Sequence, residues 1–279
     1  MTRSLSIKSI ALLESIRPFT AILGLAGAYI GGFVAGDPFA FPLILAMFVV
    51  FLITAGSMAY NDYYDHEIDA ISHPKRPIPS KRLTPRESLY FSLFLFGLAL
   101  AISLFINIIC FAIALVSLIF LYIYETYMKN QGFAGNLLVA FLSAISFTFG
   151  GAAVGQPFAS VYLSLIAFFL FTGRETLKDV EDVQGDVLSR TTLPMQIGEK
   201  NAAIVGSIFL IIAMIITPVP YLTGQLKIYY LIFISIVDLI CFYAMVETLR
   251  DISNATKTVS LLRIASGIGI IAIILGAVL

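Results

Sequence analysis

Two short segments of the sequence carry aspartates at the same spacing, D-x-x-D-x-x-x-D. Their polar members are Asn61, Asp62, Asp65 and Asp69 in the first segment, and Asp179, Asp182 and Asp186 in the second. On a helix that turns about 100° per residue, the three aspartates of a segment fall within an arc of about 60°. Each segment therefore predicts a stripe of carboxylates. Glu175 extends the second stripe, whereas Glu67 and Glu181 point elsewhere and are expected in solvent.

Carboxylates at these spacings repel one another, and a position at the end of a membrane helix adds a desolvation cost. A cation should compensate. Oxygen ligands without Cys or His favour Mg²⁺ or Ca²⁺ over zinc, and Mg²⁺ typically binds one or two carboxylates together with substrate phosphates. Two facing stripes would hold a diphosphate between bridging Mg²⁺ ions. The alternative is a pair of polar loops with incidental acids, and the repeated spacing argues against it.

Basic residues accompany both stripes. Arg76 and Arg82 lie in a proline-rich segment after the first stripe and could clamp phosphate oxygens, although they could equally be ordinary cytoplasmic anchors. Lys129 follows a tyrosine-rich segment and could neutralise a leaving diphosphate. The ring of Tyr124 in that segment could face a developing cation, or belong to the interfacial aromatic belt.

The composition places this chemistry in a membrane. Of the 279 residues, 59% are hydrophobic and 12% charged, and the mean hydropathy is +0.96. Soluble domains are about 45–50% apolar. The net charge is zero, so it indicates no nucleic-acid partner, and no cleavable signal peptide is expected. Cys110 and Cys241 both lie in apolar stretches and suggest neither a disulfide nor a metal site.

A spanning helix needs about 20 mostly apolar residues. The sequence predicts nine spans, at 19–36, 40–60, 88–106, 109–128, 134–154, 159–176, 201–222, 228–249 and 258–279. The third and fourth come from one apolar stretch of about 40 residues, which as a single helix would be about 60 Å long. Because that is twice the hydrocarbon thickness, we expect a break at Asn107.

The distribution of Lys and Arg predicts the orientation. With the N-terminus inside, sixteen basic residues lie on the cytoplasmic side and only Lys227 lies outside. The C-terminus is then outside, and the long loops 61–87 and 177–200 are cytoplasmic, so the chemistry is expected on one face. A transporter is the alternative from another functional class, but transporter sites usually lie near the membrane midplane. Asp238 is the one acid expected there, and it receives no role.

The first stripe, followed by Pro74-Lys75-Arg76-Pro77 and Arg82, resembles the UbiA superfamily of intramembrane prenyltransferases. The second stripe and the segment from Tyr124 to Lys129 support the same resemblance. It implies an all-α, multi-pass domain over 1–279, with nine helices in a horseshoe around a central cavity and cytoplasmic capping loops. The two acidic motifs also suggest pseudo-repeated halves at about 40–154 and 159–279.

The second motif, with Thr192-Leu193-Pro194 after it, is most similar to that of the archaeal digeranylgeranylglyceryl phosphate synthases. This resemblance implies transfer of geranylgeranyl to the free hydroxyl of geranylgeranylglyceryl phosphate, with prenylation of an aromatic quinone precursor as the alternative. The partners are then a prenyl diphosphate, a lipid-like acceptor and membrane lipids, and no obligate protein partner is implied.

Under this hypothesis the seven polar residues of the two stripes bind Mg²⁺. Lys129 and the six aspartates are catalytic. The expected substrate-binding residues are Asn61, Arg76, Arg82, Tyr124, Asn136, Lys178, Glu175 and Arg17.

Overall fold

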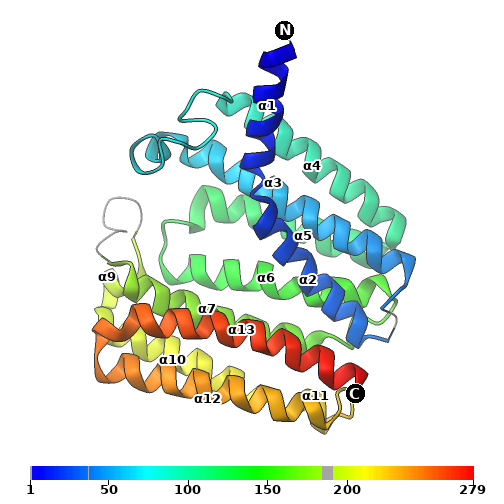
Figure 1. The fold of residues 1–279 in the computed structure, drawn as a ribbon, viewed down its shortest axis with the longest axis vertical. Coiled ribbons are helices and arrows are strands. Elements are labelled where there is room, and N and C mark those ends of the chain that lie inside the picture. The colour runs from blue at the N-terminus through cyan, green and yellow to red at the C-terminus, as the bar shows by residue number, and fades with distance from the viewer. Residues whose placement is uncertain (1, 37, 184–190) are drawn as a thin grey trace.

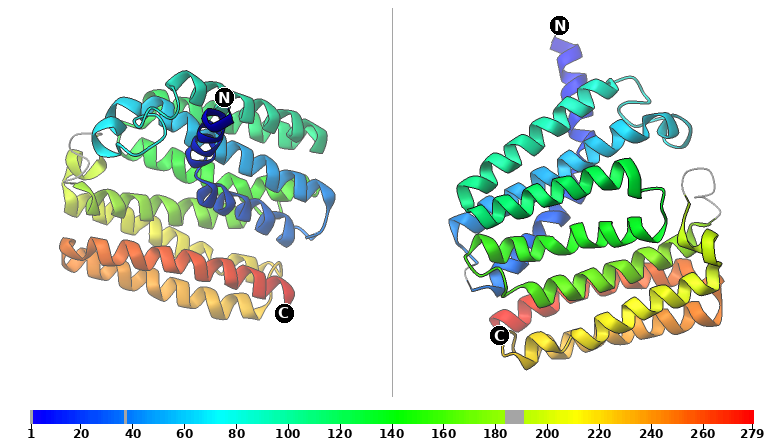
Figure 2. Two further views of the ribbon diagram at one scale, coloured as in Figure 1. Left: turned by 45° about the horizontal axis from the view of Figure 1, so that its top comes forward. Right: turned by 180° about the vertical axis from the view of Figure 1, so that it is seen from behind.

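The structure, a computed structural model, describes residues 2–36, 38–183 and 191–279, and helices are the only regular secondary structure within these ranges (Figure 1). Most of the helices run roughly parallel or antiparallel to one another, so that the connections gather at the two ends of the molecule (Figure 2). The helices are α1 (Thr2–Ser15), α2 (Pro18–Val34), α3 (Phe41–Ser72), α4 (Pro85–Ile106), α5 (Ile108–Ile123), the π-helix η1 (Tyr124–Met128), α6 (Phe133–Ala153), α7 (Val161–Glu181), α9 (Leu193–Ile197), α10 (Glu199–Ile216), α11 (Val219–Leu222), α12 (Ile228–Arg250), the 3₁₀ turn η2 (Ile252–Asn254) and α13 (Ala255–Val278).

Seven of the helical segments in the described part of the chain are long and apolar enough to cross a membrane. An eighth is added if the bent pair of Ile7–Ser15 and Pro18–Val34 forms one span, with a bend of 46°. Helix α7, where the sequence predicts the sixth span, does not qualify. Its last two turns carry Arg174, Glu175, Lys178 and Asp179, which lower its hydropathy. The chain is a multi-pass integral membrane protein, and the count of nine spans stays a prediction.

The predicted break at Asn107 is confirmed. Asn107 is extended between α4 and α5, its side chain accepts a hydrogen bond from the backbone N–H of Cys110 (2.8 Å), and its amide donates to the carbonyl of Ala152 (2.9 Å). One residue therefore ends α4, caps α5 and ties both to α6.

Helix α3 is longer than a span needs to be, and this length positions the first acidic segment. Its 32 residues extend about 48 Å, whereas the hydrocarbon core is about 30 Å thick. About 20 residues are enough to cross that core, so the turns of α3 that carry Asp62, Asp65 and Asp69 can extend beyond it. The expectation of a loop over 61–87 is therefore wrong in part, because the helix continues to Ser72 and Pro85 begins α4.

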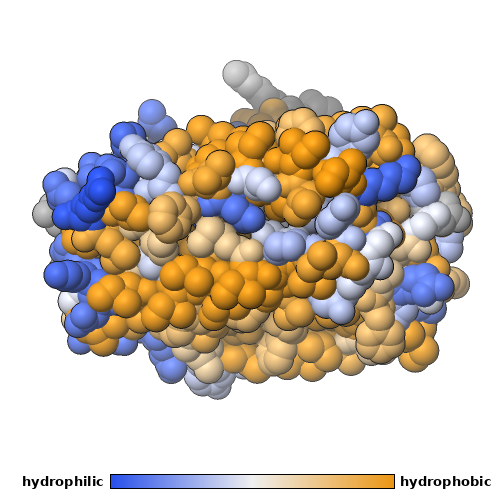
Figure 3. All heavy atoms as spheres, turned by 90° about the horizontal axis from the view of Figure 1, so that it is seen from below, coloured by the Kyte–Doolittle hydropathy of each residue, from blue (hydrophilic) through white to orange (hydrophobic). Residues whose placement is uncertain are grey.

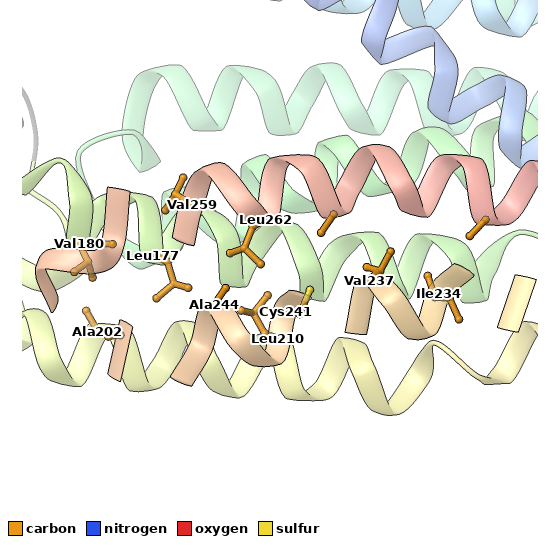
Figure 4. Packing of buried hydrophobic residues seen from close by; sticks show 14 of the residues in the cluster. Leu177, Val180, Ala202, Leu210, Ile234, Val237, Cys241, Ala244, Val259 and Leu262 are labelled. Atoms are coloured by element: carbon orange, nitrogen blue, oxygen red, sulfur yellow. The ribbon is translucent and has the colours of Figure 1, made fainter. Parts of the chain in front are cut away.

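Close packing holds the helices together. Leu177 and Val180 of α7 pack with Ala202 and Leu210 of α10 and with buried side chains of α12 and α13 (Figure 4). Elsewhere α2 and α6 approach so closely that a Cβ on Gly150 would lie 1.8 Å from the carbonyl oxygen of Ala28. Only glycine permits that approach. Cys110 and Cys241 are both buried, as expected.

The surface matches a membrane environment. Hydrophobic side chains cover the middle of the face in Figure 3, and hydrophilic ones gather mainly towards its ends. Large apolar side chains such as Phe39, Phe105 and Leu239 are strongly exposed. The C-terminal ends of α3 and α7, which carry the described aspartates of the two acidic segments, lie at the same end of the molecule (Figures 1 and 2).

Candidate active site

The first acidic stripe lies on the last turns of α3, and each of its aspartates has a basic partner. Asp62 and Asp69 are buried, and Asp65 is partly exposed. Arg17 lies 2.7 Å from Asp62, Arg76 lies 2.5 Å from Asp69, and Lys129 lies 2.6 Å from Asp65. The three basic residues come from three different parts of the chain, so the stripe is a point where these parts meet. Glu67 is exposed, as expected.

Arg17 reaches the stripe from the junction of α1 and α2. Its backbone is left-handed (φ 46°), which is costly for a residue with a side chain, and Pro18 begins α2 directly after it. Its Nη2 donates to Oδ1 of Asp62, and its Nη1 lies 3.6 Å from Sδ of Met58. The strained turn therefore aims a guanidinium at α3.

The two arginines in the loop after α3, Arg76 and Arg82, have different partners. Nη1 of Arg76 donates to both carboxylate oxygens of Asp69, at 2.5 Å each. Arg82 instead bonds to Glu14 of α1 (2.6 Å) and to the carbonyl of Lys75 (2.9 Å), and the bond to Glu14 raises the pKa of the guanidinium. The structure thus brings Arg76 to the stripe, whereas Arg82 ties the loop to α1.

Lys129 follows the π-helix η1, where its backbone N–H bonds to the carbonyl of Tyr124, five residues back (2.9 Å). Such turns inside α-helices are frequent at functional sites. The Lys129 ammonium lies between Asp65 and Glu125, 3.0 Å from the latter. Glu125 is buried, and the Asn61 amide donates to its two oxygens at 3.1 and 3.4 Å.

Glu125 is the residue at this site that sequence reasoning missed. The available signal was an acid at the end of an apolar stretch, four residues before Lys129. Tyr124 lies next to it, half-buried, and its ring comes within 3.7 Å of where a Cβ on Gly135 would be.

The second stripe lies at the end of α7. Asp179 is buried and accepts a hydrogen bond from Asn136 of α6 (2.7 Å), so these two predicted site residues meet. Glu175 is contacted by Arg174 at 2.5 Å and by Lys178 at 4.0 Å. Asp182 caps α7 and is partly buried. Asp186 lies outside the described residues.

The chemistry of these donors fits a hard divalent cation. Carboxylate and amide oxygens line both stripes, with no thiolate among them, and Arg or Lys side chains contact all three aspartates of the first stripe. The carboxylates thus attract positive charge, as a metal site would. Among the described residues, however, no three His, Cys, Asp or Glu side chains lie close enough together to hold a metal ion. Convergence of the two stripes on shared ions stays a prediction.

An apolar cavity of about 110 Å³ lies among α6, α7, α10, α12 and α13. Leu163, Leu170 and Ile234 are among its aliphatic lining residues. Asp238 also lines it, and accepts a hydrogen bond from the Thr217 hydroxyl (2.8 Å). The mid-span acid is therefore hydrogen-bonded within α10–α12 packing, away from both stripes.

Comparisons with known proteins bear on this arrangement. Residues 9–267 match the UbiA prenyltransferase family. A digeranylgeranylglyceryl phosphate synthase from Methanococcus maripaludis is 38% identical over 273 residues, which cover 96% of this chain and 98% of that protein. A solved structure reported for digeranylgeranylglyceryl phosphate synthase in membranes is 34% identical, with a TM-score of 0.88 over 97% of this chain and 99% of the other. A UbiA homologue from Archaeoglobus fulgidus, solved with DMAPP and Mg²⁺ bound, shares the fold at 16% identity, with a TM-score of 0.70 over 94% of this chain and 98% of that one.

Proposed function

The chain belongs to the UbiA prenyltransferase family, and we propose that it transfers a geranylgeranyl group from geranylgeranyl diphosphate to the free hydroxyl of geranylgeranylglyceryl phosphate. The observation that carries the proposal is the likeness to digeranylgeranylglyceryl phosphate synthases, which extends over nearly the whole chain in both sequence and structure. The product would carry the second ether bond of an archaeal membrane lipid, with pyrophosphate released.

The first stripe is proposed to bind the diphosphate end of the donor. Asn61, Asp62, Asp65 and Asp69 would hold Mg²⁺ on one side, and Asp179, Asp182 and Asp186 on the other. Glu175 and Lys178 would assist beside the second stripe. Support comes from the oxygen-only donor set and from the related fold solved with DMAPP and Mg²⁺. When bound, the metal would supply positive charge that stabilises the leaving pyrophosphate.

Basic side chains of the chain are proposed to stabilise the negative charge of the leaving pyrophosphate as well. Lys129 and Arg76 already contact carboxylates of the first stripe, so a diphosphate there would lie within reach of both. As the bond between C1 of the prenyl group and the diphosphate oxygen breaks, the electron pair leaves with pyrophosphate, and these cations stabilise it. Tyr124 would face the allylic carbon, and Asn136 would orient Asp179.

The acceptor hydroxyl then attacks C1 and loses its proton, which completes the ether bond. Water must be excluded, because it would otherwise compete for the same carbon. Arg17, which contacts Asp62, and Arg82, in the loop after α3, are the proposed partners for anionic groups of the substrates.

The proposed topology places nine spans in a horseshoe, with the N-terminus and the active site on the cytoplasmic side and the C-terminus outside. The bias of Lys and Arg supports this orientation. The location of both acidic segments at one end of the molecule agrees with a site on a single face (Figure 1).

The test is an acceptor comparison. Purified protein in detergent or liposomes is given geranylgeranyl diphosphate, Mg²⁺ and either geranylgeranylglyceryl phosphate or 4-hydroxybenzoate, and the products are identified by mass spectrometry. We expect only the first acceptor to gain the mass of a geranylgeranyl group. Prenylation of 4-hydroxybenzoate alone would replace the proposal with the aromatic alternative, and no product from either acceptor would refute it.

A further inference from the structure

Glu125 is a buried acid that belongs to neither acidic stripe. Its side chain is 3% exposed, at the inner end of a helix that is otherwise apolar. A carboxylate in such a place is costly unless its charge is compensated. Its recorded partners are the amide of Asn61 and the ammonium of Lys129, both of which the proposed function uses.

The contact between Glu125 and Asn61 determines which side-chain atom of Asn61 faces Glu125. A carboxylate only accepts hydrogen bonds, so the Asn61 NH₂ group must point towards Glu125, as its distances of 3.1 and 3.4 Å to the two oxygens indicate. The amide oxygen of Asn61 then points away from Glu125, and no hydrogen bond to it is present among the described residues. Oxygen is the atom through which an Asn side chain binds Mg²⁺.

Glu125 also fixes the position of the Lys129 ammonium. The ammonium bridges Glu125 (3.0 Å) and Asp65 (2.6 Å), so the π-turn of η1 and the stripe on α3 are joined by one charge. Glu125 therefore contacts both a metal-ligand candidate and a catalytic cation.

We propose that Glu125 is a positioning residue, which turns the oxygen of Asn61 towards the bound divalent cation and docks Lys129 beside Asp65. The inference rests on the proposed function for the identity of the reaction. Without the Glu125 carboxylate, the Asn61 amide is free to flip and present its NH₂ group, which cannot bind a metal.

The primary variant is Glu125→Gln, which keeps the size of the side chain. Its amide can receive a hydrogen bond from Asn61 or from Lys129 at its one oxygen, but it no longer requires Asn61 to present NH₂. Loss of such an outer contact typically weakens metal affinity or activity by about 10–100-fold. We expect a shift of that size in Mn²⁺ affinity, measured by electron paramagnetic resonance with inorganic pyrophosphate, and in the Mg²⁺ concentration that gives half-maximal prenyl transfer.

Glu67→Gln is the matched control, because Glu67 is an exposed acid on α3 close to the stripe and forms no hydrogen bond or ion pair with the stripe residues that the structure describes. We expect its Mn²⁺ affinity to stay within about twofold of the wild type. Equal thermal unfolding midpoints confirm that the compared variants are folded. A variant that is only destabilised would lose turnover without shifting the Mg²⁺ requirement of its folded fraction.

A second substitution keeps the proposal falsifiable. Asn61→Asp removes the NH₂ group, so either side-chain oxygen can face the metal. In the Glu125→Gln background it should restore most of the lost Mn²⁺ affinity. In the wild-type background it places two carboxylates in contact and should weaken the protein. Recovery of Mn²⁺ affinity in the folded double variant is not expected if Glu125 only stabilises the fold.

Unchanged Mn²⁺ affinity in Glu125→Gln, or no recovery in the double variant, would overturn the inference. A wild-type protein that binds Mn²⁺ and pyrophosphate but transfers no prenyl group would refute the proposed function and leave the positioning role intact.

Discussion

Replacing Lys129 with methionine should lower both the stability of the protein and the rate of catalysis, for different reasons. The Lys129 side chain is 21% exposed, and its ammonium contacts Glu125 (side chain 3% exposed) and Asp65 (side chain 23% exposed). Removing it leaves the Glu125 carboxylate buried with only the Asn61 amide as a recorded partner. Breaking a buried ion pair costs about 3–5 kcal/mol. Because the amide remains and the pair is not fully dry, we expect about 2–3 kcal/mol here.

This loss corresponds to a melting temperature lower by about 5–10 °C. The chain supplies its own reporters, because Cys110 and Cys241 are both buried free thiols that a thiol-reactive fluorophore labels only after unfolding. The rate should fall separately. Loss of one group that stabilises charge in the transition state typically lowers kcat by about 10²–10³-fold.

The double variant Lys129→Met with Glu125→Gln distinguishes the two effects. It removes the buried charge together with its counter-charge, so the melting temperature should recover most of the loss. The rate should stay low, because the cation that faces the leaving group is still missing. A double variant that regained both stability and rate would refute the assignment of Lys129 to the leaving group. So would a single variant with an unchanged kcat.

Three further predictions concern other parts of the molecule. Arg17→Ala should lower kcat/KM for the prenyl diphosphate by about 10–100-fold, since it removes a charged contact with Asp62. Arg17→Gly, which relieves the left-handed backbone, should be more stable than Arg17→Ala and equally slow. Initial rates of either variant that match those of the wild type would contradict the role of Arg17. Asp62→Asn should reduce prenyl transfer at least about 100-fold at saturating Mg²⁺ while the fold is kept, and near-normal turnover would remove it from metal binding. Gly150→Ala should lower the free energy of unfolding by more than about 3 kcal/mol, because its Cβ meets the carbonyl oxygen of Ala28. Gly97→Ala, with open space around its Cβ, should change the free energy of unfolding by at most about 1 kcal/mol. Equal melting temperatures for the two variants would contradict the close packing of α2 on α6.

The amino-acid sequence was sufficient for properties that depend on composition and local spacing. The apolar stretches predict membrane helices because a fixed hydrocarbon thickness requires about 20 apolar residues. The break at Asn107 follows from the same length argument and is confirmed in the structure. The spacing of Asp62, Asp65 and Asp69 predicts a stripe on one helix face, and α3 carries it. The family also follows, since paired motifs at such spacing are specific.

The basic residues were harder to assign, because reach and direction depend on the loops that carry them. Arg76 and Arg82 are equally plausible phosphate ligands by sequence. The loop turns Arg76 to Asp69 and Arg82 to Glu14, on another helix. Arg17 reaches Asp62 only because a left-handed residue breaks the chain between α1 and α2, a local conformation that residue spacing does not predict.

Only the tertiary structure revealed Glu125. In the sequence it reads as half of an ordinary pair with Lys129, four residues apart, of the kind found on exposed helix faces. In the folded chain Glu125 is buried in the π-turn of η1, and its carboxylate meets the amide of Asn61 on α3, 64 residues earlier in the chain. Residue type and helical period are local properties that the sequence determines, whereas desolvation and the pairing of distant charges exist only after the helices have packed.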